Sequence, residues 1–204
     1  RFSKISLGED ARLDILFMQN EHIRSRYWLD LTANLDKGSQ LDCHVLSLYG
    51  GIINNKLYAV MNSPGAVCRM DGLYLADGEQ HINYDIEVDH KAPACYSRQL
   101  FKGILDNHSR GSFNGAIKVA PGAQKTEAYQ ANHNLLLTNE AKVTTKPQLE
   151  IYADDVKCSH GASIGRLDEM GLFYLRSRGI PLAEAKMLQQ MAFVEDVLAG
   201  IRTQ

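Results

Sequence analysis

Short runs of alternating apolar and polar residues fill most of the chain, from about Phe2 to Ser163. Gly, Asn, Asp and Pro residues interrupt these runs at short intervals. Alternation with a period of two is typical of β-strands with one buried face. The pattern predicts many short strands and no long helix in this region, which argues against a doubly wound α/β fold because its parallel strands need helical crossovers.

Similar small-residue turns return after successive strands, as at Ala76-Asp77-Gly78 and Ala120-Pro121-Gly122. Such imperfect repetition is what a β-solenoid requires, because each coil stacks on its neighbour. A β-sandwich has similar short strands, so the pattern alone leaves both architectures open. In a solenoid, Asn114, Asn132, His133 and Asn134 are expected in polar ladders or turns. The apolar residues that we then assign to the interior are Leu13, Ile15, Leu29, Leu31, Val45, Leu46, Leu48, Leu57, Val60, Leu73, Leu75, Ile82, Ile86, Val88, Ile117, Val119, Leu135, Leu136, Leu137, Leu149 and Ile151.

The period of the pattern changes after Gly165. Asp168 is a suitable cap for a helix from Glu169 to Arg178, and Gly179 is a suitable stop. Pro181 is then predicted at the first position of a second helix, where a missing N–H costs nothing.

The second predicted helix carries an apolar stripe with helical spacing, which indicates packing against a neighbouring helix. We expect a β core over residues 1–165 and a helical subdomain over residues 166–204. The stripe consists of Met187, Met191, Val194, Leu198 and Ile201.

The composition is that of an ordinary soluble protein, with 45% hydrophobic and 23% charged residues among 204. A formal net charge of −2 provides no basic surface for nucleic acid. No apolar run approaches the length of a membrane span, and no signal peptide is recognisable. Four cysteines without a C-x-x-C pair fit a reducing cytoplasm.

The densest group of chemically active side chains is Asp154, Asp155, Cys158 and His160. On a strand, Cys158 and His160 point to the same face, and thiolate with imidazole suits iron, zinc or copper. The alternative is that Cys158 is a small buried side chain and His160 is a turn residue. Asp154 and Asp155 would point to opposite faces of a strand, so they are expected in a turn or an interface rather than as an acid–base pair.

The chain lacks the sequence motifs of other enzyme classes. The chain has no phosphate-binding glycine loop, no G-x-S-x-G and no H-E-x-x-H. A β-helical enzyme acting on polysaccharide stays an alternative, although Trp28 and a few tyrosines are the only aromatic lining and no carboxylate pair is evident. The histidines other than His160 are expected to be structural or on the surface.

Two segments resemble the C-terminal portion of the SufB/SufD family, the scaffold proteins of the SUF iron-sulfur cluster assembly system. They are FNGAIKVAPGAQKTEAYQANHNLLLT, residues 113–138, and KPQLEIYADDVKCSHGASIGRLDEMGLFYLRSRGI, residues 146–180. The Cys-Ser-His-Gly sequence at 158–161 resembles the SufD branch. The family fold is a right-handed parallel β-helix, and this resemblance favours the solenoid over the sandwich.

The resemblance implies a scaffold rather than an enzyme. It implies that this chain pairs with a SufB-like subunit, and that His160, with Cys158 beside it, lies at their junction. There, iron or a nascent iron-sulfur cluster would be held transiently, and we expect no cofactor bound stably by this chain alone. A single Cys and His do not complete a cluster's usual four ligands, so the partner would supply the others.

The resemblance also implies that the C-terminal helices dock the ATPase SufC. The alternative is that Leu172 and Leu175 seal the end of the β-helix while the arginines are solvated. The family's N-terminal helical region is not recognisable, which indicates a fragment, and a homodimeric structural module stays open for the isolated chain. The docking candidates are Leu172, Phe173, Tyr174, Leu175, Arg176 and Arg178.

Overall fold

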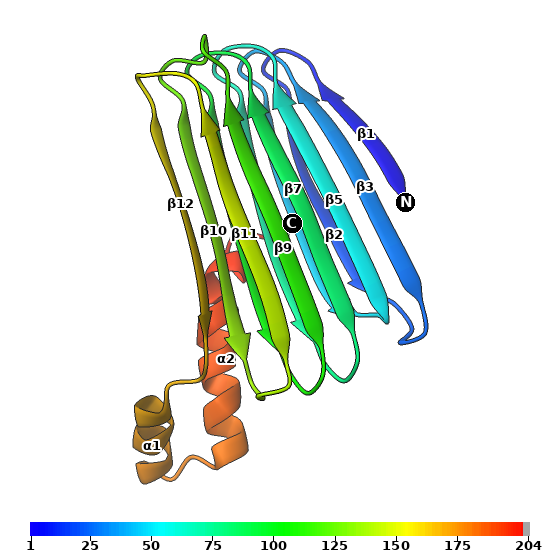
Figure 1. Ribbon diagram of the computed structural model, residues 1–204, viewed down its shortest axis with the longest axis vertical. Coiled ribbons are helices and arrows are strands. Elements are labelled where there is room, and N and C mark those ends of the chain that lie inside the picture. The colour runs from blue at the N-terminus through cyan, green and yellow to red at the C-terminus, as the bar shows by residue number, and fades with distance from the viewer. Residues whose placement is uncertain (202–204) are drawn as a thin grey trace.

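The structure is a computed structural model that describes residues 1–201, and it is a parallel β-solenoid of about six turns (Figure 1). Twelve strands alternate between two six-stranded sheets. One sheet, here sheet A, contains β1 (Phe2–Leu7), β3 (Arg26–Leu35), β5 (Ile52–Met61), β7 (His81–His90), β9 (Arg110–Val119) and β11 (Lys142–Ile151). The other, sheet B, contains β2 (Arg12–Asn20), β4 (Gln40–Tyr49), β6 (Val67–Ala76), β8 (Tyr96–Leu105), β10 (Glu127–Leu136) and β12 (Lys157–Gly165).

Each strand pairs in parallel with the strand one turn away, so one residue stacks on its equivalent from turn to turn. In sheet B, Leu41 of β4 pairs with Cys68 of β6, and Cys68 pairs with Ser97 of β8. All three side chains are buried, while the residues on either side of them on the strand are more exposed. This alternation confirms the predicted strands, and the stacking of turns confirms the solenoid rather than the sandwich.

Large aromatic side chains fill the middle of the interior. The rings of Tyr74, Tyr84, Phe101 and Phe113 follow one another with centroids 5.4, 5.2 and 5.3 Å apart. Gly72 lies directly beside Phe101, and a Cβ atom there would come within 2.3 Å of the ring. The absence of a side chain at position 72 is therefore a packing requirement of the aromatic stack.

The interior becomes polar toward β10 and β12. Asn132 and Asn134 are buried and hydrogen bonded to each other and to the hydroxyl of Tyr74, so they form the expected polar ladder. His133 points outward and its Nδ1 lies 2.7 Å from the hydroxyl of Ser163. Asn114 is also on the outside, where it donates a hydrogen bond to Asp85.

The outer face of sheet B is partly apolar because a helix covers it. Leu46, Leu73 and Leu75 pack there in one cluster with Val194 and Val197 of α2 (Leu182–Leu198). Our assignment of these three leucines to the interior was therefore wrong. The strands that carry them have apolar side chains on both faces, which alternation alone cannot distinguish. Leu135 and Leu137 belong to the same outer cluster, so their assignment to the interior was wrong as well.

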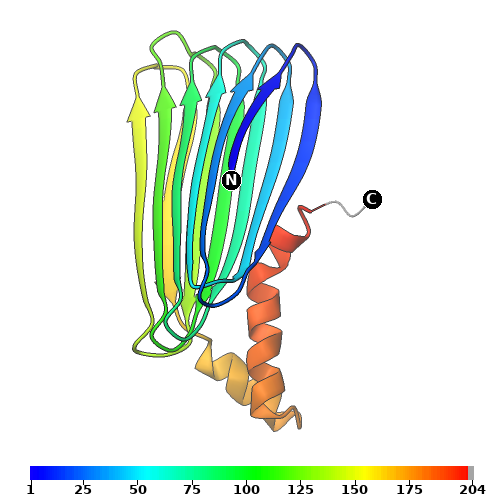
Figure 2. The same ribbon diagram turned by 90° about the vertical axis from the view of Figure 1, so that its right-hand side faces the viewer.

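The first helix, α1 (Glu169–Ser177), follows its sequence signals. Both carboxylate oxygens of Asp168 accept hydrogen bonds from the N–H groups of Met170 and Gly171, and Gly179 has a φ of +88° just after the helix. α1 and the first part of α2 project beyond the ends of the strands, and α2 then runs along the flank of the solenoid (Figure 2).

The second helix differs from its prediction in two details. Pro181 is the N-cap residue and Leu182 is the first helical residue. Ala185, Val194 and Val197 are buried and Leu198 packs against the same cluster as Val194, so this part of the expected stripe is on the packing face. Met187 and Met191 are 57% and 55% exposed, so their assignment to the packing face was wrong. The helix packs on sheet B rather than mainly on a second helix, so the α2 residues that become buried are those that face the strands. Among residues 1–201, no helix combines the length and apolar character that a membrane span needs.

Candidate functional site at the open end of the solenoid

The solenoid is open at the end formed by β11 and β12. Each is the last strand of its sheet in the described part of the chain, and β12 lies at the left edge of the fold in Figure 1. Their inward-facing side chains are more exposed than those of earlier turns because no further turn covers them within residues 1–201. Among them, Pro147 lies in the middle of β11.

Cys158 and His160 both face the interior side of this open end. Cys158 pairs with Ala128 and His160 with Gln130, and both partners are buried inside the solenoid. Residues paired in a parallel sheet point to the same face, so the prediction that Cys158 and His160 share a face is confirmed. Ser159 between them pairs with Tyr129 on the outside.

Cys158 is half-buried against a small apolar cluster. The cluster consists of Ile117, Val119, Ala123, Ala128 and Ala153. Burial raises the pKa of the Cys158 thiol, although the backbone N–H of Ala128 opposes the shift. The thiol is therefore mostly protonated and only moderately reactive in the isolated chain.

His160 differs from Cys158 in being exposed. Its imidazole is available to a molecule that approaches the open end, and imidazole nitrogen is a common ligand of iron and other transition metals. Within the described residues, no three His, Cys, Asp or Glu side chains are grouped closely enough to hold a metal ion.

Asp154 and Asp155 lie in the bend between β11 and β12 rather than on a strand. Gln124 of the preceding turn accepts a hydrogen bond from the N–H of Asp155 through its Oε1 atom, at 2.9 Å. Asp154 and Asp155 are thus turn residues, as their sequence context suggested, although their assignment to a strand was wrong.

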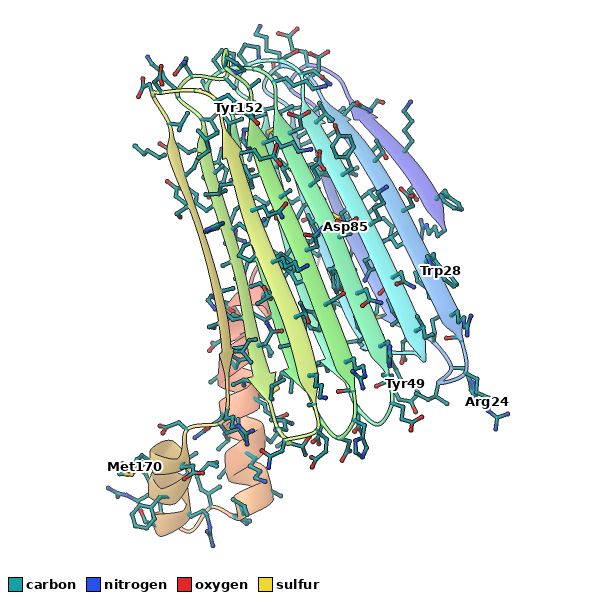
Figure 3. All side chains as sticks on the ribbon, in the orientation of Figure 1. Arg24, Trp28, Tyr49, Asp85, Tyr152 and Met170 are labelled. Carbon is teal, nitrogen blue, oxygen red and sulfur yellow. The ribbon has the colours of Figure 1, made fainter. Side chains whose placement is uncertain are left out.

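The helical candidates form an exposed apolar surface. Phe173 and Tyr174 are 70% and 57% exposed, and Arg178 stacks on the ring of Tyr174 with 5.3 Å to the centroid. Leu172 and Leu175 are half-buried, and Arg176 is exposed. Met170, on the same helix, points away from the strands (Figure 3). None of the α1 side chains is fully buried.

A charged cluster on the outer face of sheet B was not anticipated. His44 lies between Asp14, with Nε2 to Oδ1 at 3.6 Å, and Asp71, with Nδ1 to Oδ2 at 3.7 Å. Arg98 donates a hydrogen bond of 2.7 Å to Asp71. Burial raises the pKa of Asp71, and the adjacent Arg98 and His44 oppose that shift.

The same cluster borders an open hollow of about 720 Å³ beside the end of α2. Asp14, Asp42, Arg69 and Arg98 stack in register, one from each turn. The repeat of charged residues at near-constant spacing was the available signal in the sequence. This repeat can be recognised as a column of stacked side chains only when the number of residues in one turn of the solenoid is known.

Comparison with known proteins identifies the family. The family model described as SUF system FeS cluster assembly, SufBD core domain, matches residues 1–193. The chain is 35% identical over 198 residues to the iron-sulfur cluster assembly protein SufD of Escherichia coli (strain K12), covering 97% of this chain and 47% of that protein. It is 31% identical over 201 residues to a SufBD family protein of Synechocystis, covering 98% and 44%.

A third relative is SufD of Bacillus subtilis (strain 168), which is 37% identical over 121 residues, covering 59% of this chain and 28% of that protein. The chain spans less than half the length of these curated relatives. The family match covers both sheets and most of α2, and so includes Cys158 and His160. The chain therefore belongs to the SufBD core family of the SUF iron-sulfur cluster assembly system and is a homologue of SufD.

Proposed function

We propose that this chain is the core of a scaffold subunit that joins a SufB-type subunit through its open end and binds the ATPase SufC through its C-terminal helices. In this role, the subunit carries out no catalysis alone. It positions ligands so that iron or a nascent cluster forms at the junction. Its four cysteines are free thiols, which fits a reducing cytoplasm.

The observation that carries this proposal is the position of His160. An exposed imidazole lies at the uncovered β11–β12 end of the solenoid, on the interior side, with a thiol two residues away. A second subunit that covers this end would enclose both side chains. Enclosure excludes water and strengthens metal–ligand interactions.

Iron or a cluster is cargo in this proposal, not a resident cofactor. Clusters are generally held by four protein ligands, and His160 with Cys158 supplies at most two. The SufB-type partner would contribute the remainder. Binding would therefore depend on assembly of the complex.

The helices provide the second surface. Phe173 and Tyr174 expose aromatic side chains on α1, with Arg176 and Arg178 nearby in sequence. Aromatic and arginine side chains are enriched among residues that dominate binding energy at interfaces. This composition supports docking of a protein such as SufC. Because α2 packs on sheet B, movement of a docked ATPase would be transmitted to the strands.

The proposal is tested by reconstitution of cluster assembly from the complete subunit, a SufB-type partner, SufC and ATP. We expect His160→Ala to abolish cluster formation, followed by visible absorbance. His133→Ala is the matched control because His133 lies on the outward face of the neighbouring strand, and it should retain cluster formation. Equal cluster yields from wild type and His160→Ala would refute a ligand role for His160.

The role of Cys158 is tested by thiol labelling of the assembled complex with and without ATP. If closure of the ATPase exposes the thiol, labelling of Cys158 should accelerate when ATP is added. Cys68, which is buried in the middle of the solenoid, is the internal control and should stay protected. Constant protection of Cys158 under both conditions would indicate simple packing.

A further inference from the structure

A column of three polar side chains leads from the interior of the solenoid to His160. Gln99 on β8, Gln130 on β10 and His160 on β12 stand in register on adjacent strands of sheet B. Gln99 and Gln130 are buried, whereas His160 is the exposed end of the column. His160 thus occupies the position where a third glutamine would extend the ladder.

The amide of Gln130 has a defined orientation. Its Nε2 atom donates a hydrogen bond of 2.7 Å to Oε1 of Gln99. Gly115, across the interior, leaves room for this amide, because a Cβ atom there would lie 2.6 Å from Nε2 of Gln130. A side chain at position 115 would displace the amide from the ladder.

This orientation leaves two buried amide atoms of the column without a partner, the donor Nε2 of Gln99 and the acceptor Oε1 of Gln130. Oε1 of Gln130 is buried and makes no hydrogen bond within the described residues. A buried carbonyl oxygen without a partner costs about 1–3 kcal/mol, and native structures rarely leave one unsatisfied. Within residues 1–201, the strand that follows β10 at the edge of this sheet is β12, where the side chain in register with Gln130 is that of His160.

We infer that the exposed ring of His160 turns toward this oxygen, so that Oε1 of Gln130 accepts a hydrogen bond from one ring nitrogen and holds the imidazole in a single neutral tautomer. The spacing of adjacent strands, about 4.8 Å, places side chains in register within reach of each other. The second ring nitrogen then carries the lone pair and faces the open end. Gln130 is a positioning residue in this inference, because it acts on the cargo only through His160.

The inference rests on the proposed role of His160 as a ligand and extends it. Metal-binding histidines almost always donate their other N–H to a nearby acceptor, which fixes the ring and raises its basicity. Loss of such an acceptor typically lowers metal affinity or activity about 10- to 100-fold. We therefore expect the rate of cluster formation in the reconstituted complex to fall about tenfold in Gln130→Met.

The direct test is the tautomer of His160 in the protein alone, without iron or partner. Two-bond ¹H–¹⁵N NMR spectra distinguish the two neutral forms, and His160→Ala identifies the signal of this ring. Wild type should show one form at neutral pH. Gln130→Met keeps the side-chain volume but removes the acceptor, so it should give a mixture.

Two further variants separate positioning from general disturbance. Gln130→Glu retains an acceptor oxygen and should retain one tautomer. Gln148→Met is the matched control, because Gln148 is an exposed glutamine on the neighbouring β11, and it should leave the ring unchanged. A mixture of tautomers in wild type, or one tautomer in Gln130→Met, would overturn the inference.

The NMR result is independent of the assembly assay. If wild type shows one tautomer and Gln130→Met shows a mixture, the positioning role is supported. This holds even if His160→Ala still forms clusters, a result that would refute only the proposed function. A mixture of tautomers in wild type would refute the positioning role and leave the ligand role of His160 standing.

Discussion

Lys102 of β8 ties α2 to sheet B through Asp196, with 2.8 Å between Nζ and Oδ1. The same ammonium group donates a hydrogen bond of 2.7 Å to the backbone carbonyl of Phe193 and lies 4.8 Å from the centroid of its ring. The Lys102 side chain is nearly buried, whereas the Asp196 side chain is 54% exposed, so the Lys102 ammonium group is shielded from water mainly on the side of the strands. This residue joins the surface proposed for the ATPase to the strands that lead to the open end.

Lys102→Met should therefore loosen α2. Hydrogen bonds of a charged group contribute about 1.5–3 kcal/mol, and we expect a loss of about 2 kcal/mol in the free energy of unfolding. Hydrogen exchange of the α2 amides should accelerate more than that of the β8 amides. Lys118→Met is the control, because the Lys118–Glu87 pair is partly exposed on the surface and should contribute at most about 1 kcal/mol. Equal effects of the two substitutions would contradict the anchoring role.

Gly72→Ala should destabilise the solenoid. The new Cβ atom would meet the Phe101 ring at 2.3 Å, and overpacking of a core typically costs about 1–3 kcal/mol. Urea denaturation measures this loss. Gly122→Ala is the matched control, since no atom lies within 4 Å of a Cβ there, and it should leave the midpoint of unfolding nearly unchanged. An unchanged midpoint in Gly72→Ala would show that the aromatic side chains can shift to accommodate a methyl group without loss of stability.

His90 should make stability depend on pH. Burial lowers the pKa of His90 to about 4, from an ordinary value of 6.5, so the folded protein favours the neutral ring. Its contribution is present above pH 6.5 and is lost as the pH falls toward 4, by up to about 3 kcal/mol. His90→Gln can still hydrogen bond to Ser97 and should remove this part of the pH dependence.

The measurement is the free energy of unfolding of wild type and His90→Gln at pH 7, 5.5 and 4. The difference between the two proteins should change in favour of His90→Gln as the pH falls. His108→Gln, at an exposed position, is the control and should follow wild type. A constant difference across the three pH values would show that protonation of His90 does not oppose folding.

Phe173→Asp should weaken binding of SufC. The side chain is exposed in this chain, so the substitution should leave the unfolding temperature unchanged. Loss of a central aromatic contact costs at least about 2 kcal/mol at a binding hot spot, which corresponds to at least about 30-fold weaker binding. Calorimetric titration of the complete subunit with SufC measures this change.

The control for this binding prediction is Trp28→Asp. Trp28 is another exposed aromatic residue, and it lies on β3 of sheet A, far from the helices in the fold (Figure 3). We expect its binding of SufC to equal that of wild type. Wild-type affinity in Phe173→Asp would remove α1 from the docking surface.

Features that depend on neighbours in the sequence were predictable. The strands follow from alternation, and the start of α1 follows from Asp168, whose side chain caps the two N–H groups nearest to it. Cys158 and His160 share a face because strand geometry requires it. None of these inferences needs knowledge of how one turn meets the next.

Features that depend on contacts between distant residues were not predictable in this way. Leu73 has the same local pattern as an interior leucine, but α2, more than a hundred residues later, covers it on the outside. His44 meets Asp71 only because the two strands pair in one register. The acceptor beside His160 likewise emerges from the pairing of β10 with β12. Pattern analysis describes one strand at a time and does not contain these relationships.

The two strands at the open end are not equivalent as templates. Pro147 has no backbone N–H, so a new strand that paired with the free edge of β11 would make one backbone hydrogen bond fewer. β12 contains no proline and keeps every N–H from Lys157 to Gly165. Proline at an exposed edge is a common protection against fibril growth. A chain that paired with the open end would therefore lose a hydrogen bond at Pro147 on β11 but not on β12, the strand that carries His160.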